Sequence, residues 1–362
     1  VKKAKELIKN ENHEYAGIAG LNNYIRKSLE FAYGTKNVDF NKIAAVQTIS
    51  GTGACRVGAE FISRNFENKD IYLPNPTWAN HIPIMKHAGL NVKQYSYYNS
   101  NTISLDVNNM INDIYMAPDN SIILFHACAH NPTGIDPNNE NWDKILNVVK
   151  EKNHISFFDC AYQGFASGDH NKDAYPIRKF YEENQPIILA QSFSKNFGLY
   201  GERVGTLSIT TKSEEEKNNV LSDLKSIIRP MYSNPPINGA KIVNTILKNK
   251  DLYNEWSIEC KDMANRIQNM RKLLKSKLES LEYYKNNNYD PNFYSYNNHH
   301  NFRNWEHIIK QIGMFCYSGL KPNEIKSLKE KYHIYITSDG RINMAGINNT
   351  NIDYLAESIN KV

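Results

Sequence analysis

Lys195 is the residue whose type and setting could most readily do chemistry. It lies in a stretch of small, hydroxyl-bearing and glycine residues, 191–205, directly after an apolar run, 186–190, that is typical of a buried strand. α/β folds place their chemistry at such strand ends. Burying a lysine is costly unless its charge is removed or paired, and an imine with a carbonyl cofactor would remove it. Ser192 and Arg203 could then hold an anion such as a phosphate. The alternative is an exposed loop lysine beside a glycine turn.

A second candidate site is Ser50-Gly51-Thr52, which lies between an expected strand at 46–49 and an expected helix at 54–66. The free N–H groups and the positive end of the dipole make a helix N-terminus a binding place for phosphate. No Gly-Lys-Ser/Thr follows, so this is not a Walker A motif. A capped glycine turn is the alternative interpretation.

A carboxylate and an aromatic residue complete the candidates. Asp159 ends the expected strand 155–159, where a buried carboxylate needs a cationic or protonated partner, and Tyr162 follows three residues later. Standing alone, Asp159 would instead cap a turn. Trp78 stands at the tip of a proline-flanked turn, where it could either face a ligand or pack.

His126, Cys128 and His130 alternate, which is a pattern that suggests metal ligands. One short strand does not supply a closed tetrahedral site, and no second ligand pair follows at finger spacing. We therefore assign no metal.

Strands and helices must position these side chains, and they alternate from about residue 46 to 210. This order predicts a mostly parallel sheet that is covered on both faces. Further helices are expected at 212–228, 250–283 and 322–332, with the longest joining two domains, and short strands at 313–318 and 340–346. The Asn- and Tyr-rich segment 285–304 is interpreted as an insertion without an assigned function.

Composition excludes several classes of protein. The 362 residues are 41% hydrophobic and 22% charged, with a net charge of +5, as in globular proteins. No dense basic block indicates nucleic acid, and no run of 18 apolar residues could span a membrane. Five scattered cysteines favour a reducing compartment. The N-terminus lacks a signal sequence and an initiator Met, so we expect a natural start further upstream and a cytoplasmic location, leaving open an upstream organelle-targeting segment.

Several motifs, taken in order, resemble one family. They are Tyr15-Ala-Gly-Ile-Ala-Gly, Ser50-Gly-Thr-Gly-Ala, Asn75-Pro-Thr-Trp-Ala-Asn-His, His130-Asn-Pro-Thr-Gly, Asp159-Cys-Ala-Tyr-Gln-Gly-Phe, Ser192-Phe-Ser-Lys-Asn-Phe-Gly-Leu-Tyr, Tyr232-Ser-Asn-Pro-Pro, Gly313-Met-Phe and Gly340-Arg-Ile-Asn. The chain resembles the aspartate aminotransferases, which are dimeric fold-type I enzymes that use pyridoxal 5′-phosphate. The resemblance implies a mostly parallel seven-stranded sheet sandwiched by helices, plus a smaller α/β domain. The large domain would span 15–262, and the small one 1–14 with 263–362.

The resemblance also implies roles for the cofactor-binding residues. Lys195 would form a Schiff base with the cofactor and shuttle a proton, and Asp159 would pair with the pyridinium nitrogen. Tyr162 and Asn131 would hydrogen-bond the ring's phenolic oxygen, while Trp78 would stack on the ring face. The phosphate would be held by Ser50, Gly51, Thr52, Ser192 and Arg203, and by Tyr15 of the neighbouring subunit. His81 and His126 would support Asp159.

For the substrate, the resemblance implies two arginines, helped by Trp78 and Asn131. Arg341 would grip the α-carboxylate, and Arg229 of the neighbouring subunit would grip the side-chain carboxylate, both as planar forks. Two shared sites in a homodimer would then exchange the amino group between L-aspartate and 2-oxoglutarate. Only fourteen residues precede Tyr15. The family has a longer N-terminal arm, so we expect weaker closure in the chain as given.

Three other functions remain open at this point. An aromatic or broad-specificity aminotransferase of the same fold is the nearest alternative. A Schiff-base lyase or aldolase would need no pyridine or phosphate partners, and would leave Asp159 and Arg203 unexplained. A cofactor-free binding protein would leave the intact set of lysine, aspartate and arginines without a purpose.

Overall fold

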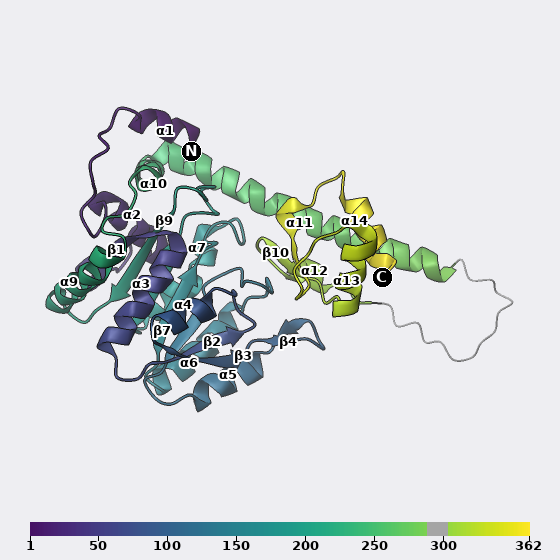
Figure 1. The fold of residues 1–362 in the computed structure, drawn as a ribbon, viewed down its shortest axis with the longest axis horizontal. Coiled ribbons are helices and arrows are strands. Elements are labelled where there is room, and N and C mark those ends of the chain that lie inside the picture. Colours follow the sequence, from purple (N-terminus) through teal and green to yellow (C-terminus); the bar gives the residue numbers. More distant parts are fainter. Residues whose placement is uncertain (288–302) are drawn as a thin grey trace. The chain divides into compact units, whose positions relative to one another are not determined.

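A computed structural model describes residues 1–287 and 303–362, with the side chains of 283–287 left out. The chain divides into two compact units. The first unit comprises 1–97, 106–128 and 137–263, and the second comprises 98–105, 129–136 and 264–362. The long helix α11, Lys250–Asn287 (Figure 1), passes through the boundary along the chain. Most of the expected insertion at 285–304 lies outside the described residues.

The N-terminal segment belongs to the first unit, although we expected residues 1–14 in the smaller domain. Helix α1, Lys2–Ile8, packs on α10, Asn238–Lys248, through its buried Ala4 and Ile8. Lys3 pairs with Glu255 of α11 at 2.7 Å. These contacts are far apart in the sequence, so the local pattern of residues 1–14 could not indicate them.

The first unit contains a seven-stranded sheet in the order β1-β9-β8-β7-β6-β2-β3. The strands are β1 Ile43–Ile49, β2 Asp70–Asn75, β3 Asn91–Ser96, β6 Ile122–His126, β7 Ile155–Cys160, β8 Ile187–Ser192 and β9 Val204–Thr210. β9 is antiparallel to both of its neighbours, and the remaining pairs are parallel. This confirms the predicted mostly parallel sheet. β6 and β8 are buried along their whole length, as expected for strands covered on both faces.

Helices cover both faces of this sheet. One face packs Leu124 and Phe157 into a core with α3 (Ser50–Asn65), α4 (His81–His87) and α9 (Glu214–Met231). The adjacent residues Phe125 and Phe158 point to the other face, because successive side chains of a strand alternate. There they form an aromatic cluster with Trp142 of α6 (Asn139–Glu151) and Phe180 of α8 (Tyr175–Glu182). Helix α5 (Val107–Met116) packs beside α6.

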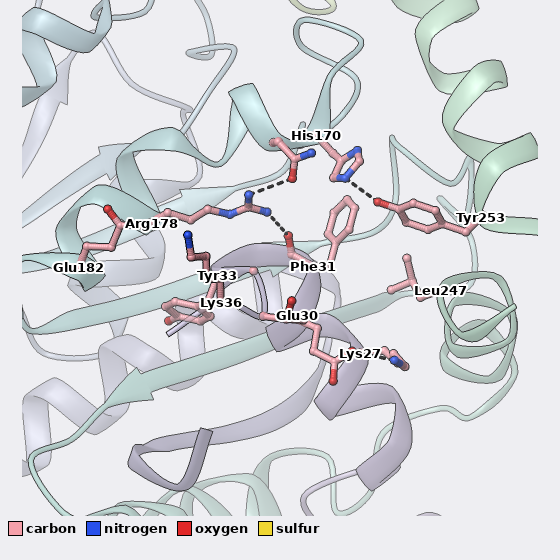
Figure 2. A pocket seen from close by; sticks show the side chains of 13 residues that line it. Lys27, Glu30, Phe31, Tyr33, Lys36, His170, Arg178, Glu182, Leu247 and Tyr253 are labelled. Atoms are coloured by element: carbon pink, nitrogen blue, oxygen red, sulfur yellow. Dashed lines mark hydrogen bonds and ion pairs between the residues drawn. The ribbon is translucent and has the colours of Figure 1, made fainter. Parts of the chain in front are cut away.

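Helix α2, Asn22–Tyr33, is fixed at its C-terminal end by Arg178 of α8 (Figure 2). The guanidinium donates to the carbonyls of Ala32 at 3.0 Å and Phe31 at 3.3 Å, and to Asn171 Oδ1 at 2.8 Å. The last carbonyls of a helix have no intrahelical donor, so a cationic side chain there both bonds them and complements the dipole. Asn171 lies in the short helix α7, His170–Asp173, which is thereby joined to α2.

The second unit is built from short elements. They are β4 (Tyr98–Asn99), β5 (Ser104–Leu105), α12 (His307–Lys310), β10 (Phe315–Tyr317), α13 (Pro322–Tyr332), β11 (Arg341–Asn343) and α14 (Ile352–Asn360), and they join the C-terminal part of α11. β10 pairs with β11 in an antiparallel ladder, with Tyr317 opposite Arg341.

Some predicted boundaries differ from the observed ones. Strands β10 and β11 are shorter than predicted, because Gly313 and Gly340 take positive φ values before them and a 3₁₀ turn, Met344–Gly346, follows β11. Helix α3 begins at Ser50 rather than at residue 54. Helix α9 continues through Pro230 to Met231, since a proline in the last turn removes only a bond near the frayed helix end.

Candidate active site

The ends of three adjacent strands bring the candidate catalytic residues together. In the sheet register, His126 of β6 lies opposite Asp159 of β7. Asp159 in turn lies opposite Ala190 of β8, and Lys195 follows the end of β8. The Nζ atom of Lys195 lies 5.2 Å from the ring centroid of Tyr162, which is buried. The predicted set of Lys195, Asp159 and Tyr162 is therefore assembled at one edge of the sheet.

The amine of Lys195 has an altered acidity. Burial lowers its pKa, the carboxylate of Asp159 partly offsets this by raising it, and the guanidinium of Arg203 lowers it further. A lower pKa leaves more of the amine neutral near physiological pH. Neutral amines are nucleophiles, so this setting prepares Lys195 for attack on a carbonyl group.

A chain of hydrogen bonds through Thr77 and two histidines ends at the carboxylate of Asp159. His81 Nε2 lies 3.0 Å from Asp159 Oδ2, and Thr77 Oγ1 lies 2.8 Å from His81 Nδ1 and 3.1 Å from His126 Nε2. The arrangement that satisfies every atom has His126 donating to Thr77, Thr77 donating to His81, and His81 donating to Asp159. Trp78 packs edge-on against His81, with ring centroids 5.1 Å apart. Thr77 was not singled out from the sequence, although it lies within the quoted motif that begins at Asn75.

Electrostatics keep Asp159 ionised. Burial raises the pKa of this carboxyl, but the hydrogen bond from His81 and the nearby charge of Lys195 oppose burial, and the pKa lies below its ordinary value. Burial also lowers the pKa of His126 to about 3, so its ring is neutral near physiological pH. A buried carboxylate at this position can pair with a cationic group on a ligand.

Three serine hydroxyls gather where α3 begins. Ser50 Oγ lies 3.1 Å from Ser192 Oγ and 2.9 Å from Ser194 Oγ, and all three residues are buried. Ser50 has a φ of 60°, and its N–H donates to the carbonyl of Arg203. This confirms that Ser50-Gly51-Thr52 lies at a helix N-terminus. Ser194 was missed from the sequence, although its alternation with Ser192 could have indicated it.

Gly51 leaves room that a larger residue would fill. A Cβ atom added there would lie 3.0 Å from the Cβ of Ser192, which is tighter than ordinary packing. The cluster therefore lies close against the backbone of α3, whose first N–H groups have no intrahelical acceptor. Hydroxyl donors, a helix N-terminus and a glycine at the closest approach are features of an anion-binding cradle.

Arg203 forms hydrogen bonds through both its side chain and its backbone. Its side chain is exposed and donates from Nη1 to the carbonyl of Tyr200 at 3.1 Å. Its backbone carbonyl accepts from the N–H of Ser50, a member of the serine cluster, at 3.2 Å. A guanidinium contact with an anion in the cradle therefore remains a prediction.

Tyr15 and Arg229 share one open pocket, which Tyr232, Ser233 and Asn234 also line. The Nη1 atom of Arg229 donates to Ser233 Oγ at 2.7 Å, and Asn234 Nδ2 donates to the carbonyl of Ala16 at 2.7 Å. Tyr15 is 88% exposed in the single chain. The two residues that the resemblance assigns to a neighbouring subunit thus lie together on the surface of the first unit.

Asn131 and Arg341 belong to the second unit and meet there. Arg341 Nη1 donates to Asn131 Oδ1 at 2.8 Å, and the guanidinium carbon lies 4.4 Å from the ring centroid of Phe315. Asn131 is buried, whereas Arg341 is partly exposed. The guanidinium of Arg341 uses one of its five N–H donors on Asn131 and lies over the ring of Phe315. Its other donors can therefore bind a carboxylate.

The donor atoms of Cys55, His81 and Asp159 lie within 4.8 Å of one another. We assign no metal to them, because His81 and Asp159 already bond each other and burial raises the pKa of the Cys55 thiol well above its ordinary value. Within 1–287 and 303–362, His126, Cys128 and His130 do not gather into a ligand group.

None of the helices in those ranges is both long and apolar enough to cross a bilayer.

Comparison with known proteins shows the family. The family model described as aminotransferase class I and II matches residues 1–359. The chain belongs to this family. It is 49% identical to the mitochondrial aspartate aminotransferase of Dictyostelium discoideum, over 99% of this chain and 81% of the relative.

Two solved aminotransferases have the same fold. The cytoplasmic aspartate aminotransferase of Saccharomyces cerevisiae is 40% identical with a TM-score of 0.92, over 99% of this chain and 86% of that one. The broad-specificity aminotransferase of Leishmania mexicana is also 40% identical with a TM-score of 0.92, over 99% of this chain and 85% of that one. The expectation of a fold-type I aminotransferase with a mostly parallel sheet is therefore confirmed, and the chain is an enzyme of the aminotransferase class.

Proposed function

We propose that this aminotransferase moves the amino group between L-aspartate and 2-oxoglutarate, with pyridoxal 5′-phosphate as its cofactor. The observation that carries the proposal is the partly buried Lys195, with its lowered pKa, beside the ionised Asp159 at adjacent strand ends. The names of its relatives support the choice of substrate.

The residues present fit this cofactor at three points. The serine cluster and the start of α3 suit a phosphate, and the close approach at Gly51 keeps larger side chains out. Asp159 suits a protonated ring nitrogen, because its carboxylate stays ionised. Lys195 suits the aldehyde, since its lowered pKa favours the nucleophilic amine. When bound, the cofactor supplies a ring that withdraws electrons from the substrate Cα.

The side chains of the first unit would then divide the work. Asp159 would hold a proton on the ring nitrogen, while His81 and Thr77 keep its carboxylate oriented. Lys195 would take a proton from the substrate Cα and deliver it to the C4′ atom of the cofactor. Tyr162, which lies beside Lys195, would donate a hydrogen bond to the ring's phenolic oxygen. Trp78 would stack on the ring face.

The substrate carboxylates would be held by two arginines. Arg341, together with Asn131, binds the α-carboxylate, and Arg229 of a partner subunit binds the side-chain carboxylate. The protein would act as a homodimer, with Tyr15 contributing to the partner's phosphate site. The exposed pocket shared by Tyr15 and Arg229 supports this, because a partner chain could cover it.

The proposal is tested by loading the purified protein with pyridoxal 5′-phosphate and recording its visible spectrum before and after adding L-aspartate. We expect a visible band that changes with aspartate, and borohydride reduction followed by peptide mass spectrometry should find the label on Lys195. Lys195→Ala should lose both, whereas the exposed control Lys86→Ala should keep both. A label on another lysine, or an active Lys195→Ala protein, would contradict the assignment.

A second candidate is broad-specificity transamination, which the similarity to the Leishmania mexicana enzyme favours. Arg229→Ala separates the two functions. A paired arginine lost from a closed site costs about 2–5 kcal/mol. An aspartate-specific enzyme should therefore lose about 30-fold or more in kcat/KM for aspartate and far less for phenylalanine. Measurable turnover of phenylalanine by the unmutated enzyme, with equal losses on both substrates, would favour the broad-specificity enzyme.

A further inference from the structure

Arg271 of α11 is a fully buried arginine in the second unit, with 0% of its surface exposed. Among the described residues no carboxylate forms a salt bridge with it. Burial lowers the pKa of its guanidinium, which nevertheless remains charged, because arginine does not lose its proton in proteins. A buried charge without a counter-ion is costly, and the Nε atom of Arg271 is itself buried without a hydrogen-bond partner, so the partners of its other donors need an explanation.

Three of those partners are backbone carbonyls of one segment, and the thiol of the adjacent Cys316 is a further hydrogen-bond partner. Nη1 donates to Ile308 at 3.1 Å, and Nη2 donates to Gly313 at 3.0 Å and also to Phe315. The segment has few regular backbone bonds of its own, because it joins the one-turn helix α12 to the three-residue strand β10. Arg271 therefore takes the place of secondary structure in holding this segment.

The same segment contacts Arg341 directly. Phe315 carries the ring that lies 4.4 Å from the Arg341 guanidinium. The strand that begins at Phe315 pairs with the strand that begins at Arg341, with Tyr317 and Arg341 opposite each other. Moving the carbonyl of Phe315 would move both the ring and the ladder that orient Arg341.

The segment also contacts the loop that carries Asn131. The N–H of Ile312 donates to the carbonyl of Gly134 at 2.7 Å. At Gly134 an added Cβ would lie 2.8 Å from the carbonyl oxygen of Phe315, so the two backbones touch with no side chain between them. Arg271 thus holds one segment against which both Arg341 and the loop of its partner Asn131 rest.

We propose that Arg271 is a positioning residue for carboxylate binding, which sets the orientation of the Arg341–Asn131 pair through the carbonyls of Gly313 and Phe315. The proposal rests on the proposed function, since it takes Arg341 as the ligand of the substrate carboxylate. Lysine keeps the charge but cannot reach several carbonyls with a rigid fork, so Arg271→Lys should misplace Arg341 rather than remove it.

The test compares Arg271→Lys with Arg266→Lys in the cofactor-loaded enzyme. Arg266 lies on the same helix and also donates to carbonyls, those of Ala345 and Ile347, but its side chain is exposed and it does not bond the segment 308–315. Binding of maleate, a dicarboxylate without an amino group, is measured by calorimetry, and kcat and KM for aspartate are measured separately. We expect Arg271→Lys to lower the affinity for maleate about tenfold and to raise KM for aspartate about tenfold. The value of kcat should change by less than about threefold, as it does when a mutation removes only substrate binding. Arg266→Lys should change each value by less than about twofold.

A double-mutant cycle with Arg341→Ala shows whether the effect passes through Arg341. If it does, Arg271→Lys should weaken maleate no further in the Arg341→Ala background, whereas a merely structural role would add its full effect there. Arg271→Met is the second variant, because it removes the donors to the three carbonyls while keeping an unbranched chain; a thermal unfolding transition establishes that it is folded. It should weaken maleate at least as much as Arg271→Lys.

The outcomes separate the inference from the proposed function. Unchanged maleate binding in both Arg271 variants, with weakened binding in Arg341→Ala, overturns the inference alone. Additive effects in the cycle also overturn it. Unchanged maleate binding in Arg341→Ala would contradict the proposed role of Arg341 as the carboxylate ligand. The positioning role of Arg271, which depends on it, would then be contradicted too.

Discussion

Thr77 links two histidines that determine the state of Asp159. Its single hydroxyl lies within hydrogen-bonding distance of His81 and of His126, at 2.8 Å and 3.1 Å. A hydroxyl can accept from one ring and donate to the other, so it defines which nitrogen of each histidine carries the proton. His81 is then left with an N–H to donate to Asp159. A residue that is remote from the substrate thus contributes to the charge at the centre of the site.

Thr77→Val is expected to shift the pH profile of the enzyme. Valine has a similar shape but no hydroxyl, so His81 loses the partner that orients it. Because the hydrogen bond from His81 holds the pKa of Asp159 down, loosening it should raise that pKa. Activity that needs the ionised carboxylate is lost as pH falls through this pKa, so the acid limb of kcat/KM should move to higher pH. Thr102→Val, at an exposed position, should leave the profile unchanged. An unshifted limb in Thr77→Val would contradict the role.

At the scale of elements, the start of α3 forms the proposed phosphate cradle, and Gly51 tests it. Gly51→Ala places a Cβ only 3.0 Å from that of Ser192, so the serine cluster must shift. We expect the affinity for pyridoxal 5′-phosphate to fall by about tenfold, corresponding to about 1.4 kcal/mol. Gly201→Ala is the matched control, because an added Cβ there meets no atom within 4 Å. The affinities of Gly51→Ala and Gly201→Ala are measured by fluorescence titration with the cofactor. Equal affinities would show that Gly51 does not contribute to phosphate binding.

The cap of α2 by Arg178 makes a separate prediction about stability. Arg178→Leu removes the donors to the carbonyls of Ala32 and of Phe31, the second of which Figure 2 shows, and both carbonyls lose that partner at the helix end. Losing two such bonds at a half-buried position should cost about 1–3 kcal/mol. A lower urea midpoint is therefore expected, with little change in kcat for the folded enzyme. Lys27→Ala, which breaks only a surface pair with Glu30, should cost less than about 1 kcal/mol. Equal costs for the two variants would show that the cap is unimportant.

At the scale of the whole molecule, the proposed dimer would share its sites between chains. Lys195→Ala and Arg229→Ala chains should each be inactive on aspartate when pure. After mixing under conditions that exchange subunits, about one site in each mixed dimer would combine an intact Lys195 with a partner's intact Arg229. Partial recovery of aspartate turnover is expected, measured against each variant mixed with itself. Mixed dimers that form, as shown by differential tagging, yet stay inactive would refute the shared site.

The sequence by itself determined the order of strands and helices and the positions of Lys195 and Asp159, because both depend on local information. Apolar runs define the strands, and the residue that follows a buried strand must lie at its end. The motif spacing was also sufficient to indicate the aminotransferase family, which the comparisons confirmed.

Only the tertiary structure decided the contacts between residues that are far apart in the chain. Thr77 bonds His126 across 49 positions, and Arg271 bonds Phe315 across 44. Ser194 joins Ser50 because the turn after β8 meets the start of α3, and α1 joins the first unit because α10 and α11 lie beside it. A hydrogen bond depends on the final position of both atoms within a few tenths of an ångström, and no periodicity along the chain encodes that distance.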